Sequence, residues 1–103
     1  MQINFLKIKT MNTYILKFDV YNDIDFPKGS IVTVIDPKWE FEVVEGRLKG
    51  KRGNVADGLS GWLLEDTLEN RMLFKNLISK VKQLESAVNR LDKEWESLPT
   101  VNV

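Results

Sequence analysis

The sequence predicts an all-β barrel followed by one long α-helix, and two observations lead to this fold class. Between residues 13 and 68, several short apolar segments are separated by turns that contain glycine, as in small antiparallel barrels. From residue 74 to residue 98, large apolar residues recur every seven positions without any Gly or Pro. At 103 residues, the chain has room for one compact domain and an extension.

The composition narrows the classes of function. Lys and Arg number 15 and Asp and Glu number 15, so no net charge draws the chain to nucleic acid or to an anionic membrane. Cys and His are both absent, which removes thiol nucleophiles, imidazole bases and the common zinc ligands. We therefore expect no enzyme, no catalytic residue, no metal site and no cofactor.

The N-terminal residues predict the cellular location. They lack the continuous apolar core of a signal peptide, and no run of residues approaches the roughly 18 apolar residues of a membrane helix. The absence of cysteine fits a reducing compartment. We expect a cytoplasmic protein without membrane contact.

The barrel is expected to consist of short strands in sequence order. Residues 13–20, 30–35 and 39–45 combine β-branched and aromatic residues, and shorter segments follow at 54–56 and 62–64. Residues 21–29 contain Asn, Asp, Pro and Gly, which favour a loop. The expected organisation is an N-terminal strand or arm at 1–12, a barrel at 13–68, a coiled-coil helix at 69–98 and a tail at 99–103.

Residues 14–69 resemble an SH3 domain. Ile15 to Val20, followed by Asp23 to Ile35, is similar to the family's opening strand, acidic loop, Lys-Gly turn and apolar strand. Trp39 matches the Trp that begins the next strand, and Gly61 to Leu64 resembles the closing segment of SH3 and bacterial SH3-like domains. The resemblance implies an SH3-like barrel.

The resemblance also implies a protein-binding site at Trp39, Asp23 and Asp25, which match ligand-binding positions of the family. The Tyr and Pro residues that line the family's polyproline groove are replaced, so this specificity is not implied. The replacements are Phe18, Val20, Leu64 and Thr67. The two carboxylates are equally compatible with ordinary turn residues.

The C-terminal repeat predicts an interface between helices. The residues at the a and d positions of the heptads are Phe74, Leu77, Val81, Leu84, Val88, Leu91, Trp95 and Leu98. A helix over 74–98 would be about 37 Å long at about 1.5 Å per residue, longer than a barrel of about 25 Å. Exposing the distal apolar side chains of this helix to water would cost free energy, so we expect a homodimer through this helix. Both parallel and antiparallel pairing are open. A helix folded back on its own barrel, or paired with another protein, remains an alternative.

The helix start has two interpretations. Asp66 to Glu69 has the spacing of a capping box in which Asp66 is the N-cap and Glu69 reaches back to its amide. The SH3 resemblance instead favours a last strand over 67–71.

A second candidate site is the basic hairpin at 46–53. It carries Arg47, Lys49, Lys51 and Arg52 between glycines, a pattern that suits phosphate or nucleic-acid contact in KOW-type barrels. A solvated turn explains the same residues, and the balanced net charge favours that explanation.

These observations together predict a non-catalytic, dimeric binding, adaptor or inhibitor module that presents an SH3-like barrel to a protein partner. Two barrels in one dimer would raise avidity on a repeated target. The small size and composition suit a regulator from a phage or mobile element. The alternative is a KOW-like nucleic-acid or ribonucleoprotein binder that uses the basic hairpin 46–53.

Overall fold

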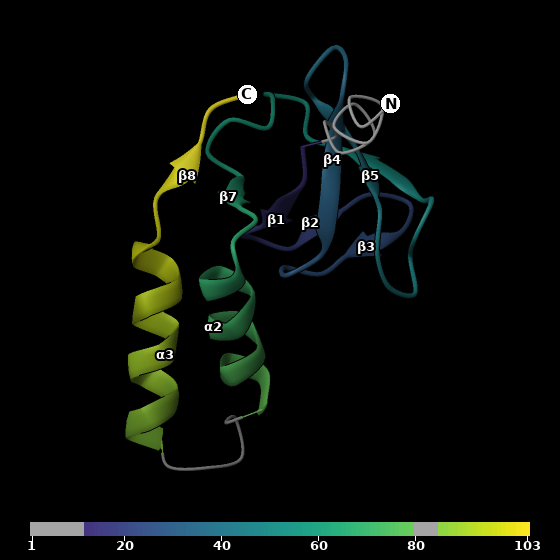
Figure 1. Ribbon diagram of the computed structural model, residues 1–103. Coiled ribbons are helices and arrows are strands. Elements are labelled where there is room, and N and C mark those ends of the chain that lie inside the picture. Colours follow the sequence, from purple (N-terminus) through teal and green to yellow (C-terminus); the bar gives the residue numbers. More distant parts are fainter. Residues whose placement is uncertain (1–11, 80–84) are drawn as a thin grey trace, which may run out of the picture.

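A computed structural model of the chain describes residues 12–79 and 85–103, with the side chains of residues 85–88 left aside (Figure 1). Strands predominate in the first part and helices in the second. The elements are β1 Tyr14–Leu16, β2 Val20–Tyr21, β3 Asp25–Phe26, β4 Ile31–Ile35, β5 Glu40–Val43, β6 Arg52–Asn54, β7 Leu63–Glu65, α2 Leu68–Ser79, α3 Glu85–Ser97 and β8 Thr100–Val101. Over the described residues, the chain is thus a small, mostly β domain with two short helices.

The strands form an open antiparallel sheet, so the prediction of a closed barrel is wrong. Six strands pair in the order β6-β5-β4-β1-β7-β8, and β2 and β3 form a separate two-stranded hairpin. Within the described residues, β6 and β8 are the unclosed edges of the large sheet. β8 lies where the sequence predicts a tail, and it pairs with β7 through Leu63 opposite Val101.

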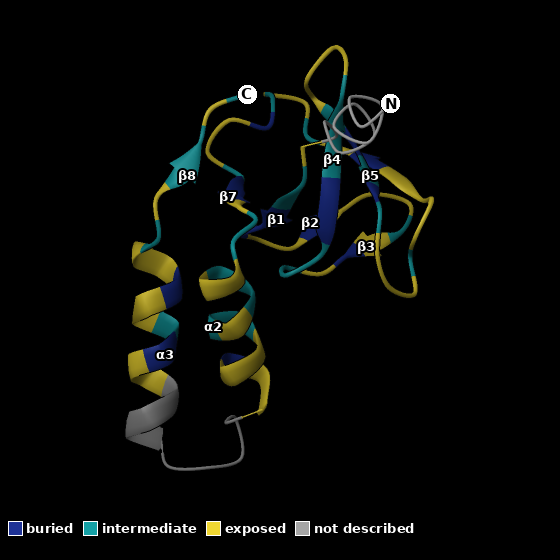
Figure 2. Cartoon of the chain, in the orientation of Figure 1, coloured by how far each residue is buried: buried dark blue, intermediate teal, exposed yellow. Residues whose placement is uncertain are grey.

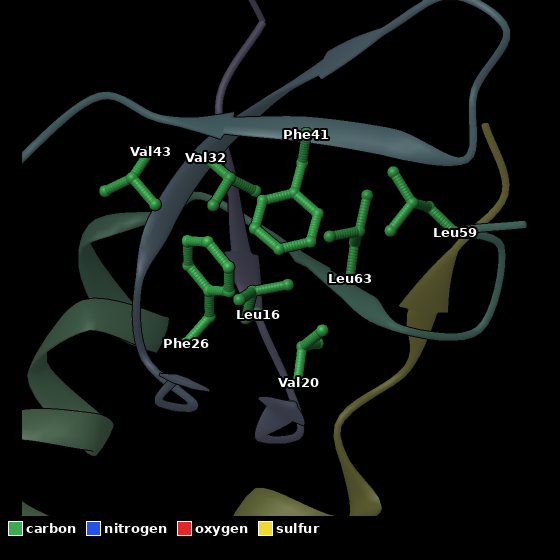
Figure 3. Close-up of a cluster of buried hydrophobic side chains, with 8 residues drawn as sticks. All are labelled: Leu16, Val20, Phe26, Val32, Phe41, Val43, Leu59 and Leu63. Carbon is green, nitrogen blue, oxygen red and sulfur yellow. The ribbon is translucent and has the colours of Figure 1, made fainter. Parts of the chain in front are cut away.

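Consecutive apolar residues in the central strands are buried on opposite faces of the sheet. Leu16 and Val32 belong to one buried cluster, whereas their neighbours Ile15 and Ile31 belong to another. The first cluster consists of Leu16, Val20, Phe26, Val32, Phe41, Val43, Leu59 and Leu63 (Figure 3). Side chains alternate between the faces of a strand, so an adjacent apolar pair serves two cores.

The second cluster lies between the sheet and the helices. Ile15, Ile31 and Leu64 of the sheet pack there with apolar residues of α2 and α3. The two helices run side by side beyond one end of the sheet, and their outer faces are exposed (Figure 2). Within the described residues, neither helix is long and apolar enough to cross a membrane.

The prediction of one long coiled-coil helix is therefore wrong. Phe74 and Leu77 on α2, and Leu91, Trp95 and Leu98 at or beyond α3, pack within the chain's own second cluster. The rings of Phe74 and Trp95 lie 5.3 Å apart between centroids. Val81 and Leu84 lie outside the described residues, and so does the side chain of Val88. The heptad repeat predicts that a stripe of apolar side chains is buried. Two short helices of one chain that pack on each other bury such a stripe as well as the helices of two chains do.

Lys17 joins the sheet to the end of α3. Its Nζ donates hydrogen bonds of 2.7 Å to the carbonyl oxygens of Glu96 and Leu98. The indole N–H of Trp95 donates back to the carbonyl oxygen of Lys17 at 2.9 Å. The last carbonyl oxygens of a helix lack partners within the helix and attract positive charge. Lys17, which directly follows β1, therefore caps the C-terminal end of α3.

The start of α2 corrects the capping prediction and the alternative of a last strand over 67–71. Thr67, not Asp66, is the N-cap, because its Oγ1 accepts the backbone N–H of Asn70 at 3.0 Å. The carboxylate of Asp66 instead accepts hydrogen bonds from Arg71 and from the hydroxyl of Thr13. The Asp66 side chain therefore forms tertiary contacts, and the side chain of its neighbour Thr67 caps the helix.

Candidate protein-binding surface

The β2–β3 hairpin presents polar and aromatic side chains on its outer face. Val20 faces Phe26 and Tyr21 faces Asp25 across the hairpin. Val20 and Phe26 are buried in the first cluster, whereas Tyr21 is 72% exposed and Asp25 is exposed. Strand alternation thus separates an anchoring face from a face available to a partner.

Asp19 stabilises the base of this hairpin. Its Oδ1 accepts the backbone N–H of Lys28 at 2.7 Å, and its Oδ2 accepts the hydroxyl of Tyr21 at 3.3 Å. The negative charge of Asp19 raises the pKa of the Tyr21 phenol. The Tyr21 hydroxyl, like any phenol with an ordinary pKa of about 10, keeps at physiological pH the proton that it donates to Asp19.

Asn22 fastens the hairpin to the edge strand β6. Its Oδ1 accepts the backbone N–H of Asn54 at 2.8 Å, and its Nδ2 donates to the carbonyl oxygen of Asn54 at 3.3 Å. A Cβ at the neighbouring Gly53 would lie 2.6 Å from atoms of Phe26 and Phe41. The close approach of hairpin and edge strand thus requires glycine at position 53.

Trp39 lies at the same edge of the sheet. Its side chain is 46% exposed, and its carbonyl oxygen accepts the backbone N–H of Val55 at 2.8 Å. With Glu40, Asn54 and Ala56, Trp39 lines a shallow cavity of about 250 Å³. Asn54 therefore belongs both to the cavity of Trp39 and to the attachment of the acidic hairpin.

We name these residues the acidic aromatic surface: Asp19, Tyr21, Asp23, Asp25, Trp39 and Glu40. The predicted residues Trp39, Asp23 and Asp25 are all exposed. The sequence interpretation missed Tyr21, although its position directly after the buried Val20 places it on the outer face. It also missed Phe18 as an exposed aromatic side chain, which is 44% exposed and meets Trp62 edge-on at 5.5 Å.

The basic residues of hairpin 46–53 differ in their surroundings. Arg52 donates to the carboxylate of Glu42 at 3.0 Å. Arg47, Lys49 and Lys51 are exposed and form no salt bridge with any described residue. The sequence-predicted basic site therefore keeps three of its four charges available.

In the described part of the chain, no three His, Cys, Asp or Glu side chains gather closely enough to hold a metal ion. Comparison of the chain with models of protein families, with curated proteins and with solved structures found no match.

Proposed function

We propose that the chain is a non-catalytic protein-binding module whose acidic aromatic surface receives a cationic segment of another protein. The observation that carries this proposal is the position of Trp39. Its side chain is nearly half exposed at the edge of the sheet, and hydrogen bonds from Asn22 hold the β2–β3 hairpin, with Asp23 and Asp25, at the same edge. The SH3 resemblance of residues 14–69 pointed to the same three residues, but the sheet is open and is not the barrel of that family, so the proposal rests on the exposure of Trp39, Asp23 and Asp25 in this structure.

The chemistry of the surface suits an Arg or Lys side chain next to an apolar one. Carboxylates pair with a guanidinium or ammonium group, and an indole or phenol ring attracts the same cation through its π face. Exposed Trp and Tyr side chains contribute much of the free energy at protein interfaces. Asp23 and Asp25 form no hydrogen bond or salt bridge with a described side chain, so both remain available to a partner.

Selection from a random peptide library on the full-length protein tests this proposal. We expect recovered peptides to be enriched in Arg and Lys beside apolar residues. Trp39→Ala should weaken their binding roughly 30-fold, which corresponds to about 2 kcal/mol. Trp39→Tyr should restore part of the affinity because it keeps an aromatic ring with a polar tip.

Charge variants provide the matched comparison. The double variant Asp23→Asn, Asp25→Asn should weaken binding and reduce its dependence on salt, while Glu69→Gln, an exposed position on α2, should change neither. Circular dichroism should show every variant folded. Peptides without cationic enrichment, or equal affinity for the wild type and folded Trp39→Ala, would refute the proposal.

Nucleic-acid binding by hairpin 46–53 is the second candidate, favoured by the exposed Arg47, Lys49 and Lys51. It is weaker because Arg52 is paired with Glu42, and the hairpin's apolar residue, Leu48, packs on the first cluster and offers no aromatic ring for base stacking. This candidate predicts RNA binding that falls steeply as salt is raised. Retention on RNA that is absent even at low salt would exclude it.

A further inference from the structure

A second surface lies away from Trp39, between α2 and the connections β3–β4 and β5–β6. Two adjoining cavities of about 370 and 200 Å³ share Gly29, Ile31 and Phe74, and together we name them the α2 groove. The larger cavity extends to Arg47 and the smaller one to Ile78. We propose that the α2 groove binds an acidic segment of a partner protein that also carries large apolar side chains.

Gly29 and Phe74 form the shared floor of the groove. The backbone of Gly29 has a φ of +91°, and an added Cβ would lie 2.3 Å from the Phe74 ring. The ring therefore lies directly against the turn, a contact that any other residue at position 29 would disturb. The floor is built into the fold and does not depend on a ligand.

Apolar side chains line the groove without being fully covered. Ile31 is 9% exposed, Phe74 is half-buried, and Ile78 at the end of the groove is 55% exposed. An exposed apolar side chain beside a cavity gains free energy when a partner removes it from water. The groove therefore offers a place for a Leu or Phe side chain.

The charges that remain at the rim are positive. Of the acidic residues, only Glu45 lines the groove, and both of its oxygens accept hydrogen bonds from Arg71 at 3.0 and 2.9 Å. Lys28, Arg47 and Lys75 also line it, and none of them forms a salt bridge with any described residue. Three uncompensated cations around an apolar floor are complementary to carboxylates that flank apolar side chains.

This chemistry favours an acidic protein segment over nucleic acid. The apolar side chains that line the groove are mainly aliphatic, and its one aromatic ring, the half-buried Phe74, is already packed against Gly29 and Trp95. Single-stranded nucleic acid gains affinity by stacking bases on exposed aromatic faces, which this floor does not offer. The surface is also opposite in charge to the acidic aromatic surface, so it is a distinct site for a different partner segment.

Fluorescence anisotropy on the full-length protein tests the proposal with two labelled peptides. One alternates Asp or Glu with Leu and Phe, and the other has the same apolar residues with Lys in place of the acids. We expect only the acidic peptide to bind. Lys75→Glu and Arg47→Glu should each weaken it about five-fold, and Ile78→Ser should weaken it about ten-fold, the changes expected when a rim charge is reversed or an apolar contact is lost.

The chain offers a matched control for each variant. Lys93→Glu makes the same charge change on an exposed residue of α3 outside the groove, and Met72→Ser alters a residue of α2 that is 54% exposed, against 55% for Ile78. Neither control should change the affinity. The proposal is overturned if the acidic peptide fails to bind, or if the controls weaken it as much as the groove variants do. It is also overturned if RNA displaces the acidic peptide from the groove. A dimer in sedimentation that Ile78→Ser dissociates, while Met72→Ser does not, would show that a second copy of the chain occupies the groove and would overturn the proposal too.

Discussion

Lys17 carries a buried charge that no described carboxylate neutralises. Lys17 is 7% exposed, yet among the described residues the hydrogen-bond partners of its Nζ are only the carbonyl oxygens of Glu96 and Leu98. The negative end of the α3 dipole and these two carbonyls replace the water that burial removes. The Lys17 side chain therefore adds to the attachment of the C-terminal end of α3, beside the packing of Trp95 and the pairing of β8 with β7.

The Lys17→Met variant should lower the free energy of unfolding by about 2 kcal/mol, because two carbonyl oxygens lose a charged donor. Urea denaturation followed by Trp fluorescence measures this change. Lys93→Met, at an exposed position of α3, should change stability little. Equal effects of the two substitutions would show that the buried cap contributes nothing particular.

A comparison of two glycines with similar backbone angles distinguishes the cost of backbone strain from the cost of a steric clash. Gly29 and Gly46 have φ values of +91° and +85°, but only at Gly29 would a Cβ collide with a neighbour, the Phe74 ring. Gly46→Ala should cost about 1 kcal/mol from backbone strain alone. Gly29→Ala should cost about 1 to 3 kcal/mol more because the ring must move. Thermal denaturation of both variants measures the difference, and equal melting temperatures would contradict the contact.

At the scale of elements, an ionic network attaches the start of α2 to the sheet. The guanidinium of Arg71 contacts Asp66 at 2.6 Å and Glu45 at 2.9 Å, and Asp66 also accepts the hydroxyl of Thr13. The hydrogen bond from Arg71 is the main cause that lowers the pKa of Asp66, and the same contacts raise the pKa of Arg71. Through Arg71 and Asp66, the network thus connects the start of α2 with Glu45 and with Thr13, which are both distant from it in sequence.

The lowered pKa of Asp66 predicts how stability depends on pH. Folding favours the ionised carboxylate, so its contribution is fully present above the ordinary Asp pKa of about 4 and is lost as pH falls through the lower folded-state pKa. Urea denaturation at a series of acidic pH values should show this loss in the wild type. Asp66→Asn should be less stable at neutral pH and should show a flatter decline in acid. Parallel pH profiles for the two proteins would contradict this role of Asp66.

At the scale of the whole molecule, local patterns predicted β1, β4, β5 and β7, but β3 lies in the segment 21–29 that was predicted as a loop and β8 in the predicted tail. The patterns also did not show how the sheet and the helices complete the core. Trp39 to Glu45 alternates clearly, and β5 occurs within it. The pairs Ile15-Leu16 and Leu63-Leu64 indicate strands buried on both faces, but they do not say that helices of the same chain cover the second face. Trp39, Asp23 and Asp25 are exposed, as a binding site requires, whereas Tyr21 was missed because a strand of two residues is too short to show a period and residues 21–29 were interpreted as a loop.

The burial of Leu91 and Trp95 against the chain's own sheet makes the helices part of one cooperative unit. These residues are 8% and 2% exposed without any second chain. Leu91→Ala should therefore lower the free energy of unfolding of the whole domain by about 2 to 5 kcal/mol. Its melting temperature, like that of the wild type, should not depend on protein concentration, because the core is completed within one chain. A melting temperature that rises with concentration would instead show that a second copy covers these side chains, as the sequence-predicted homodimer requires.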